Sequence, residues 1–376
     1  MKEAGGPGTT YKPESKLFYT EEVAEPLRWW AVLGTSGPTP AAGVWLFELE
    51  DHVWDPEILL PGADPWAKAD VLFQDGTLTI TLRDNQDSLG GNPKQSTLYS
   101  MQYLGSGDWG PMSGPTPITT NSPETLTVAR DSVGRLWTTY EAGSKIRVGY
   151  TAPYGTSFTF FTLSQTNVKG DDISAVSAFG GDRIGVFWSD QNSRRDIFAW
   201  RSDTDAVGAG WHYETAYGNG VGGCPTSTSP LCADDHINVK VYGNEIFVAI
   251  KTSLNDASPS APGDPLISLL HRDAAGAWSA STVATVSQNV TRAVAVLSPS
   301  TSKIWVFGTR GSEVDVWESP FSSPSFIPTA FVPWVKGVKA NDATSTKQVT
   351  TAESGVVVEV SVTAKNQYWH NEFLPG

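Results

Sequence analysis

The sequence predicts an all-β protein that forms a single β-propeller, with seven four-stranded blades as the expected number and six as the alternative. Hairpin-like segments of one kind occur six times along the chain, and their second strands recur roughly every 50 to 60 residues, a spacing typical of propeller blades. The composition also favours β-structure with many turns, because it combines 15 Trp with 36 Gly and 25 Pro. No segment shows a competing helical period.

Each repeat consists of an alternating strand, a turn that contains Gly or Ser, and a more apolar strand. The copies are ADVLFQDGTLTITL from Ala69, TLTVARDSVGRLWTTY from Thr125, DISAVSAFGGDRIGVFW from Asp172, HINVKVYGNEIFVAI from His236, RAVAVLSPSTSKIWVF from Arg292 and TSTKQVTTAESGVVVEV from Thr344. Several copies continue into a third strand, such as KIRVGY at 145–150, and then into a turn and a strand that begins near a Trp. The repeat therefore predicts four strands in chain order, which is the pattern of one blade.

A further unit lies at the N-terminal end, where RWWAVLG, GVWLFELE and HVWDPEIL predict three strands between Arg28 and Leu60. The segment 16–22, KLFYTEE, is expected to supply the missing strand of this unit or of the C-terminal one, which closes the ring without a free sheet edge. Since no linker-like break interrupts the repeats, we expect residues 1–15 to be a flexible N-terminal segment and residues 16–376 to be a single propeller domain.

Charge and hydropathy exclude two classes of partner. The formal net charge is −14 and no cluster of Lys or Arg offsets it, so we expect no nucleic-acid partner. No stretch approaches about 18 uninterrupted apolar residues, so we expect no membrane-spanning helix. The expected partner is a glycan or another neutral to anionic small ligand.

The cysteines give an indication of the compartment. Cys224 and Cys232 enclose a short loop rich in Pro, Ser and Thr, and their spacing is too irregular for a C-x-x-C motif. We predict a disulfide between them, with two free thiols as the alternative, and a disulfide favours an oxidising compartment. Because the first residues contain no apolar run, we expect a cytosolic protein or a secreted one whose signal sequence has been removed, and the cysteines favour the secreted, extracellular location.

The turns that introduce Trp109, Trp211 and Trp278 resemble degenerate Asp boxes of sialidase-type (BNR) propellers. The phrases DDISAV, GVFWSDQ, CADDHINVK, PLISLLHR and QYWHN, all between residues 170 and 376, are similar to a group of largely uncharacterised bacterial extracellular proteins with sialidase-like propellers. The resemblance implies the fold and the extracellular location but assigns no chemistry. A sialidase itself is disfavoured, because no FRIP-like segment is present and the adjacent Tyr140 and Glu141 of a strand point to opposite faces.

Residues at the start of each innermost strand are expected to meet at one mouth of the central channel. The polar residues and one Trp at these places are Trp66, Lys68, Asp70, Asp171, Asp172, Asp234, Asp235, His236, Thr291, Arg292, Thr346, Lys347 and Gln348. Carboxylates, an imidazole and cations in one funnel suit sugar hydroxyls, acid-base catalysis or an anionic sugar. The alternative is a structural role, in which the same side chains cap strand ends and bridge neighbouring blades.

Two acidic pairs, Asp171-Asp172 and Asp234-Asp235, are the most specific part of this ring, because they precede equivalent strands of consecutive blades. Paired carboxylates can furnish an acid and a base, and His236 can shuttle protons. The predicted catalytic residues are Asp172, Asp235 and His236, and the predicted ligand-binding residues are Trp66, Lys68, Asp70, Arg292 and Lys347. We expect no metal and no other cofactor, since DxDxDG and His-rich zinc patterns are absent, with Ca²⁺ as the alternative.

Most tryptophans are expected in the core between blades, and Trp66 is expected to stack on a sugar at the rim. The leading hypothesis is an extracellular propeller that recognises a carbohydrate, with cleavage of a glycosidic bond by the mouth carboxylates as its enzymatic form. A non-catalytic interaction or structural module is the first alternative, and a polysaccharide lyase, which needs a base and a cation near a uronate, is the second. The sequence leaves the choice between catalysis and binding open.

Overall fold

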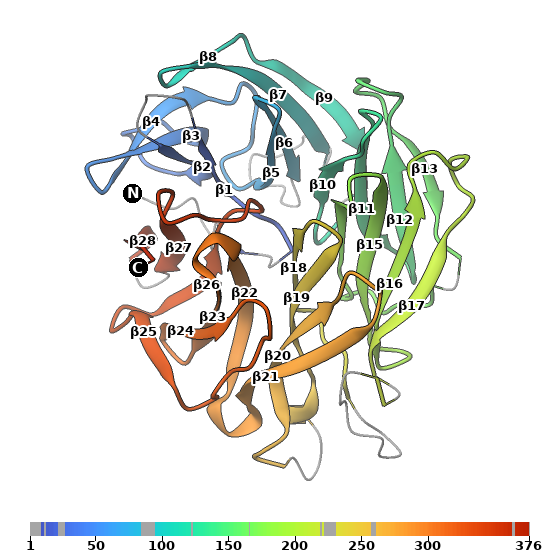
Figure 1. The fold of residues 1–376 in the computed structure, drawn as a ribbon. Coiled ribbons are helices and arrows are strands. Elements are labelled where there is room, and N and C mark those ends of the chain that lie inside the picture. The colour runs from blue at the N-terminus through green and yellow to red at the C-terminus, as the bar shows by residue number, and fades with distance from the viewer. Residues whose placement is uncertain are drawn as a thin grey trace.

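Seven antiparallel β-sheets surround a central axis in the computed structural model of the chain, which confirms the predicted seven-bladed propeller (Figure 1). The structure describes residues 9–10, 13–21, 27–83, 95–121, 123–164, 166–218, 220–221, 231–256, 261–362 and 365–375. Helix in these ranges is confined to single 3-10 turns at Leu254–Asp256, Val286–Gln288 and Pro299–Thr301. None of these helices is long and apolar enough to cross a membrane.

The first two blades differ in size. The first blade contains β1 (Leu17–Thr20), β2 (Arg28–Thr35), β3 (Gly43–Glu50) and β4 (Val53–Leu59). The second contains β5 (Lys68–Gln74), β6 (Thr77–Arg83), β7 (Ser96–Gly105), β8 (Asp108–Trp109) and β9 (Ser113–Thr119). Both β8 and β9 pair with the long β7, so the outer edge of this blade is divided between two strands.

The next four blades each have four strands in chain order, as the repeat predicts. The third has β10 (Thr127–Arg130), β11 (Leu136–Ala142), β12 (Lys145–Tyr150) and β13 (Thr159–Thr162). The fourth has β14 (Ser174–Phe179), β15 (Arg183–Asp190), β16 (Arg195–Ser202) and β17 (His212–Tyr217). The fifth has β18 (Ile237–Tyr242), β19 (Glu245–Lys251), β20 (Pro265–Arg272) and β21 (Trp278–Thr285). The sixth has β22 (Val290–Ser298), β23 (Lys303–Arg310), β24 (Glu313–Pro320) and β25 (Phe331–Val335).

The seventh blade shows three strands in the described part of the chain, β26 (Ala340–Thr344), β27 (Val356–Val362) and β28 (Gln367–Phe373). The repeat predicts that its innermost strand begins at Thr344, whereas β26 ends there. The irregular pairing of β26 with β27 between Asn341 and Thr344, together with left-handed backbone at Lys339 and Asp342, explains why the alternating pattern does not reveal this strand. Lys347 therefore follows the innermost strand instead of entering it.

The ring closes between the seventh and first blades, where segment 16–22 supplies β1 as the innermost strand of the first blade. Leu17 forms a parallel bridge with Thr346. The side-chain amide of Gln348 accepts a hydrogen bond from the Tyr19 N–H and donates one to the Tyr19 carbonyl, both at 2.9 Å. The side chain of Gln348 thus satisfies the backbone N–H and C=O groups of Tyr19, as a neighbouring strand would.

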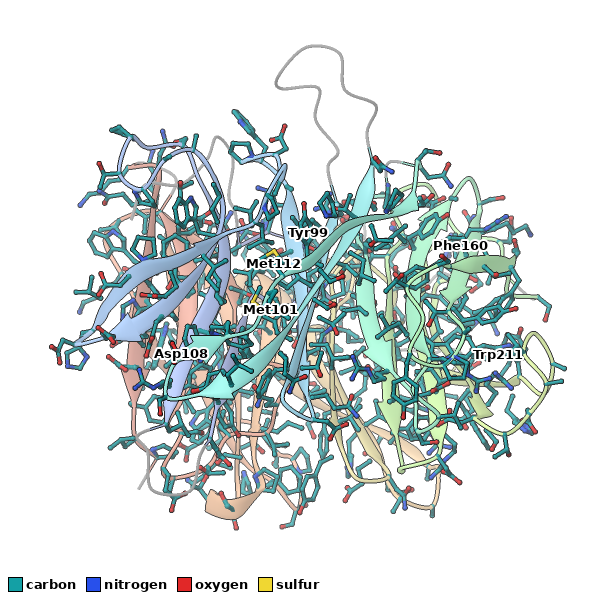
Figure 2. All side chains as sticks on the ribbon, turned by 90° about the horizontal axis from the view of Figure 1, so that it is seen from above. Tyr99, Met101, Asp108, Met112, Phe160 and Trp211 are labelled. Carbon is teal, nitrogen blue, oxygen red and sulfur yellow. The ribbon has the colours of Figure 1, made fainter. Side chains whose placement is uncertain are left out.

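Apolar side chains from neighbouring blades form the core, as expected for a propeller. One cluster joins Phe18 and Trp30 of the first blade to Ile80, Tyr99 and Met101 of the second. Met112 packs against the same cluster (Figure 2). All 15 Trp lie in the described part and none is exposed, which agrees with the expected core role of most of them.

The chain before β1 lies inside the propeller. Glu14 and Lys16 are fully buried and form an ion pair at 3.0 Å, and Glu14 forms a second ion pair with Arg83 at 2.9 Å. The Ser15 N–H donates to the carboxylate of Asp70 at 2.7 Å. The buried chain thus begins before the expected boundary at residue 15, since Pro13, Glu14 and Ser15 are already buried.

The two cysteines of the predicted disulfide differ in how they are described. Cys232 is fully buried in the core cluster between the fourth and fifth blades, whereas Cys224 lies outside the described residues. The bond therefore stays a prediction. Protein made under oxidising conditions and alkylated while folded and unreduced should gain no thiol adducts by mass spectrometry. Labelling of both cysteines would contradict the bond.

Replacement of Glu14 by Ala should destabilise the propeller strongly. The change leaves the buried Lys16 and Arg83 cations without this carboxylate, and the loss of one partner from a buried ion pair typically costs about 3–5 kcal/mol. Urea denaturation measures the free energy of unfolding. Glu353→Ala, an exposed control, should change it by less than about 0.5 kcal/mol. Equal stability of the two variants would show that the buried N-terminal chain does not hold the ring.

Candidate functional site

Polar residues gather where the innermost strands begin, at the end of the channel that we call the N-terminal mouth. A cavity of about 210 Å³ at this mouth is lined by Thr10, Glu124, Ile173, Asp235, His236, Arg292 and Asp342. These residues come from the N-terminal chain and from the starts of the third to seventh blades. Three of the predicted site residues, Asp235, His236 and Arg292, are therefore brought together.

His236 is held between two carboxylates just before β18. Its Nδ1 lies 2.5 Å from Asp234 and 2.7 Å from Asp235. Asp234 is buried and also accepts hydrogen bonds from Lys251 and from the Ser253 hydroxyl. This arrangement fixes the imidazole and leaves Asp235 half-buried at the cavity wall.

The two carboxylates stabilise the protonated imidazole. Burial alone lowers the pKa of His236, but hydrogen bonds to Asp234 and Asp235 outweigh it, so that its pKa is raised. Burial likewise opposes the charged form of Asp234, but the bonds from His236 and the charge of Lys251 lower its pKa. The raised pKa favours the imidazolium form of His236, which makes this residue poorly suited to act as a base.

Arg292 forms the other cationic wall of the cavity. Its Nε lies 3.0 Å from the buried carboxylate of Asp342, and its side chain is 38% exposed. Both residues have left-handed backbone, with φ of 58° at Arg292 and 55° at Asp342. Such conformations cost non-glycine residues of order 1 kcal/mol or more and concentrate at functional sites.

Two glutamates in or near this mouth hold protons at unusually high pH. Burial and the charge of Asp235 raise the pKa of Glu124 to about 7. Burial and the charges of Asp172 and Glu124 raise the pKa of Glu141 to about 7. The buried Oε1 atom of Glu141 has no hydrogen-bond partner among the described residues, which fits a protonated carboxyl.

The sequence reasoning missed Glu124 although a signal was present. Glu124 directly precedes Thr125, where the second repeat begins, and so occupies the place that Asp235 occupies before His236. Glu141 was considered there only as a neighbour of Tyr140. It lies at the end of β11, and only the antiparallel return of that strand brings it to the N-terminal mouth.

Asp172 is buried beside the cavity rather than in its wall. Its carboxylate accepts hydrogen bonds from the Lys169 N–H at 2.7 Å and the Ser189 hydroxyl at 2.9 Å, and from the Gln191 N–H. Burial raises its pKa to about 6 despite these bonds. The structure therefore places Asp172 as a group that acts on Glu141 through charge.

The remaining predicted residues lie elsewhere. Trp66 is half-buried and Lys68 is buried at the start of β5, and neither lines the cavity. The fully buried Asp70 accepts hydrogen bonds from the Ser15 and Val128 N–H groups and from Lys347. Lys347 lines a different cavity, which is described below.

Calcium fits this site poorly. Asp234, Asp235 and His236 form a group of three potential metal ligands whose ligand atoms lie within 4.8 Å of one another. Ca²⁺ takes six to eight oxygen ligands, and here the two carboxylates already bind His236 and Lys251. The residues present suit a shared proton better than calcium, and the absence of a cofactor stays an expectation.

The class defined by this geometry is a seven-bladed propeller with an acidic, titratable pocket at one channel mouth. No family model and no curated protein matches the chain. Among solved structures, an ulvan lyase described as a new family of polysaccharide lyase is 11% identical over 97% of this chain and 95% of its own, with a TM-score of 0.54. The same enzyme bound to -[GlcA(1-4)Rha3S]- gives a TM-score of 0.51 at 11% identity, with the same coverage.

Two further structures are similar at lower scores. A leech intramolecular trans-sialidase is 8% identical over 82% of this chain and 68% of its own, with a TM-score of 0.47. The chain spans about half of prolyl oligopeptidase B from Galerina marginata, which is 10% identical over 92% of this chain and 47% of its own, with a TM-score of 0.48. At such identities the likeness is one of fold, so the sialidase resemblance extends to the propeller and no further.

Glu141→Gln should stabilise the protein at pH 8 and leave its stability unchanged at pH 4. The folded state raises the pKa of this carboxyl from 4.5 to about 7, so it binds more protons than the unfolded state between these values. Its contribution to stability is therefore lost as pH rises through this window, and the neutral amide avoids that loss. Thermal unfolding across pH 4–8 measures the difference. A melting-temperature gain that is equal at all pH values would contradict the titration.

Proposed function

We propose that the N-terminal mouth binds a glycan and cleaves one of its glycosidic bonds by acid-base catalysis. The observation that carries this proposal is the presence in one cavity of Glu124, an acid whose pKa lies near 7, and Asp235, a carboxylate ion-paired with His236. Glycoside hydrolysis needs one carboxyl group that is protonated and one that is charged. A cavity of about 210 Å³ is smaller than a typical ligand pocket and suits a single sugar residue.

Each group has a defined task in this reaction. The proton of Glu124 passes to the glycosidic oxygen as its bond to the sugar carbon breaks. A water molecule forms the new bond to that carbon, and its proton passes to the carboxylate of Asp235. His236 holds Asp235 in place and balances its charge, so that Asp235 acts without rotating away.

The charge of the cavity favours a neutral glycan. A uronate would face Glu124, Asp235 and Asp342, and Arg292 is already paired with Asp342. A lyase that used His236 as its base would need the neutral imidazole, which the two neighbouring carboxylates disfavour. These observations favour hydrolysis over elimination.

We also propose an extracellular location for this activity. The fold of ulvan lyase, a polysaccharide-degrading enzyme, supports a carbohydrate-related function at the coarse level of fold. The predicted Cys224–Cys232 bond supports an oxidising compartment.

Variants of the two carboxyl groups test the proposal. The protein is incubated with neutral polysaccharides such as xylan, mannan, arabinan and galactan, and new reducing ends are measured. Glu124→Gln and Asp235→Asn should each lower turnover by about 10²–10⁴-fold, the usual contribution of a positioned acid or base. Glu353→Gln should retain full activity, because Glu353 is exposed and lines none of these cavities.

Three outcomes of this assay count against hydrolysis at this mouth. Product formation that survives both substitutions would place catalysis elsewhere. Unsaturated uronate ends, detected by ultraviolet absorbance after incubation with acidic polysaccharides, would identify a lyase. Glycan binding without any product would identify a non-catalytic module.

The rate should fall as pH rises above neutral. Burial and the charge of Asp235 raise the pKa of Glu124 to about 7, so the acid form is lost above that pH. A pH profile of kcat/KM for the protein should therefore show a basic limb near pH 7, and Asp235→Asn should move that limb to lower pH in its residual activity. An unmoved limb would show that another group sets it.

A further inference from the structure

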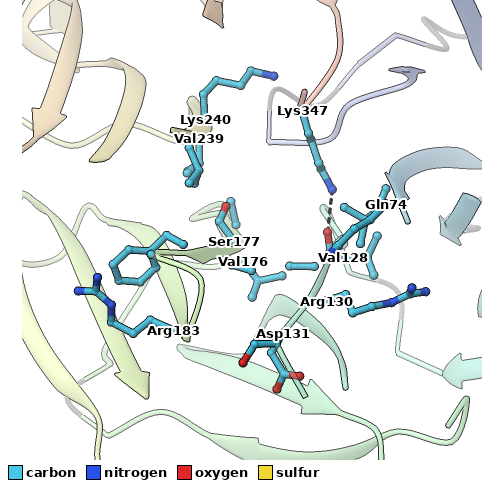
Figure 3. A pocket seen from close by; sticks show the side chains of 18 of the residues that line it. Gln74, Val128, Arg130, Asp131, Val176, Ser177, Arg183, Val239, Lys240 and Lys347 are labelled. Carbon is cyan, nitrogen blue, oxygen red and sulfur yellow. Dashed lines mark hydrogen bonds between the residues drawn. The ribbon is translucent and has the colours of Figure 1, made fainter. Parts of the chain in front are cut away.

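A second and larger cavity lies where the innermost strands end, at the opposite end of the channel. Its volume is about 410 Å³, and its walls include Val128 and Arg130 of β10, Ser177 of β14 and Lys240 of β18 (Figure 3). Lys347, which follows β26, also lines it. Because the innermost strands run in one direction around the channel, this end is distinct from the N-terminal mouth. We call it the C-terminal mouth.

Two cations at the C-terminal mouth have no carboxylate partner among the described residues. Lys240 is buried, and its ammonium donates only to the Thr346 carbonyl at 2.5 Å and the Ser15 hydroxyl at 3.4 Å. Arg130 is half-buried and donates only to the Thr79 hydroxyl at 3.2 Å. Lys347, by contrast, is paired with Asp70.

A buried lysine without a counter-ion is costly. Burial and the charge of Lys347 lower the pKa of Lys240 to about 7, and the charge of Asp70 opposes this only in part. An anion bound in the cavity would supply the missing charge. On a chain with a net charge of −14, these unpaired cations are a local exception to the prevailing repulsion of anions.

An adjoining cavity extends this site toward the outside of the third blade. Its volume is about 520 Å³, and it shares Gln74, Arg130, Asp131 and Ser132 with the cavity at the C-terminal mouth. Arg130 thus lies at the junction of the two. The combined lining contains the amide of Gln74, the hydroxyl of Ser132 and the guanidinium of Arg130, which can bind the hydroxyls of a sugar chain. It also contains the carboxylates of Asp75, Asp131 and Asp203, of which Asp131 is paired with Arg135 and Asp203 accepts hydrogen bonds from Ser132.

Tyr154 in the adjoining cavity presents an aromatic ring to solvent, with 84% of its surface exposed. Its backbone has a φ of 57°, and its N–H donates to the Gly134 carbonyl at 2.8 Å. A Cβ at Gly134 would lie 2.7 Å from the ring, so this glycine makes room for it. The ring is held outward at the cost of left-handed backbone, which is typical of a residue that serves binding.

We propose that the C-terminal mouth and its adjoining cavity bind an acidic oligosaccharide, with carboxylates of different uronate residues at Arg130 and at Lys240 and a sugar ring stacked on Tyr154. A guanidinium matches a carboxylate in bidentate geometry. The ring of Tyr154 offers a rigid, amphipathic surface of the size of a pyranose. The site requires no catalysis and does not depend on the function proposed for the N-terminal mouth.

Calorimetric titration of the full chain with trigalacturonate, and with galactotriose as the neutral probe, tests this inference. Trigalacturonate should bind and galactotriose should bind at least ten-fold more weakly. Arg130→Gln, at a half-buried position, and Tyr154→Ala, at an exposed one, should each weaken trigalacturonate binding at least ten-fold without a change in melting temperature. Lys336→Gln removes an exposed cation outside both cavities and should leave the affinity unchanged.

Further arms separate this site from the N-terminal mouth. Glu124→Gln should leave trigalacturonate affinity unchanged, whereas it lowers turnover by about 10²–10⁴-fold if the proposed function holds. The inference is overturned if trigalacturonate does not bind, if pentaglutamate binds as tightly, or if Arg130→Gln and Tyr154→Ala retain the parent affinity. Loss of affinity in Glu124→Gln alone would place the uronate at the N-terminal mouth and would also overturn it.

Discussion

Two buried carboxylates inside the channel hold the closed ring together. Glu14 binds Lys16, Arg83 and the Leu126 N–H, and so joins the chain before the first blade to the second and third blades. Asp70 binds the N–H groups of Ser15 and Val128 and the ammonium of Lys347, which follows the innermost strand of the seventh blade. Because buried charges are stable only when each is paired, these contacts place β1 in the ring and bring the last blade against the first.

The same chain helps to shape both ends of the channel. Thr10 lines the cavity at the N-terminal mouth and Pro13 lines that at the C-terminal mouth. The two ends differ in charge, since the first gathers Glu124, Asp235 and Asp342. The second contains Lys240 and Arg130, which have no carboxylate partner among the described residues, beside Asp131 and Asp203. One propeller therefore offers two surfaces of opposite electrostatic preference, and neither would follow from the net charge of the chain.

Much of the candidate site follows from a simple rule, that residues before the innermost strands meet at one mouth. The rule brings Asp235, His236 and Arg292 together and, applied to the strand after Glu124, includes that residue also. It fails for Lys347, because β26 ends at Thr344 after an irregular pairing that an alternating pattern does not reveal. It cannot find Glu141, which reaches the mouth only through the return of β11, or Tyr154, which lies in a loop.

The sequence by itself determined the all-β class, the blade count and the chain order of the strands, because hairpin repeats with period-two alternation are local patterns. It also determined where acidic pairs stand relative to those strands. The tertiary structure decided which charges are paired and which lack an oppositely charged partner among the described residues. That depends on contacts such as the one between Asp70 and Lys347, which are 277 residues apart. The burial of Asp70 beside this partner is a property of the closed ring that no local pattern contains.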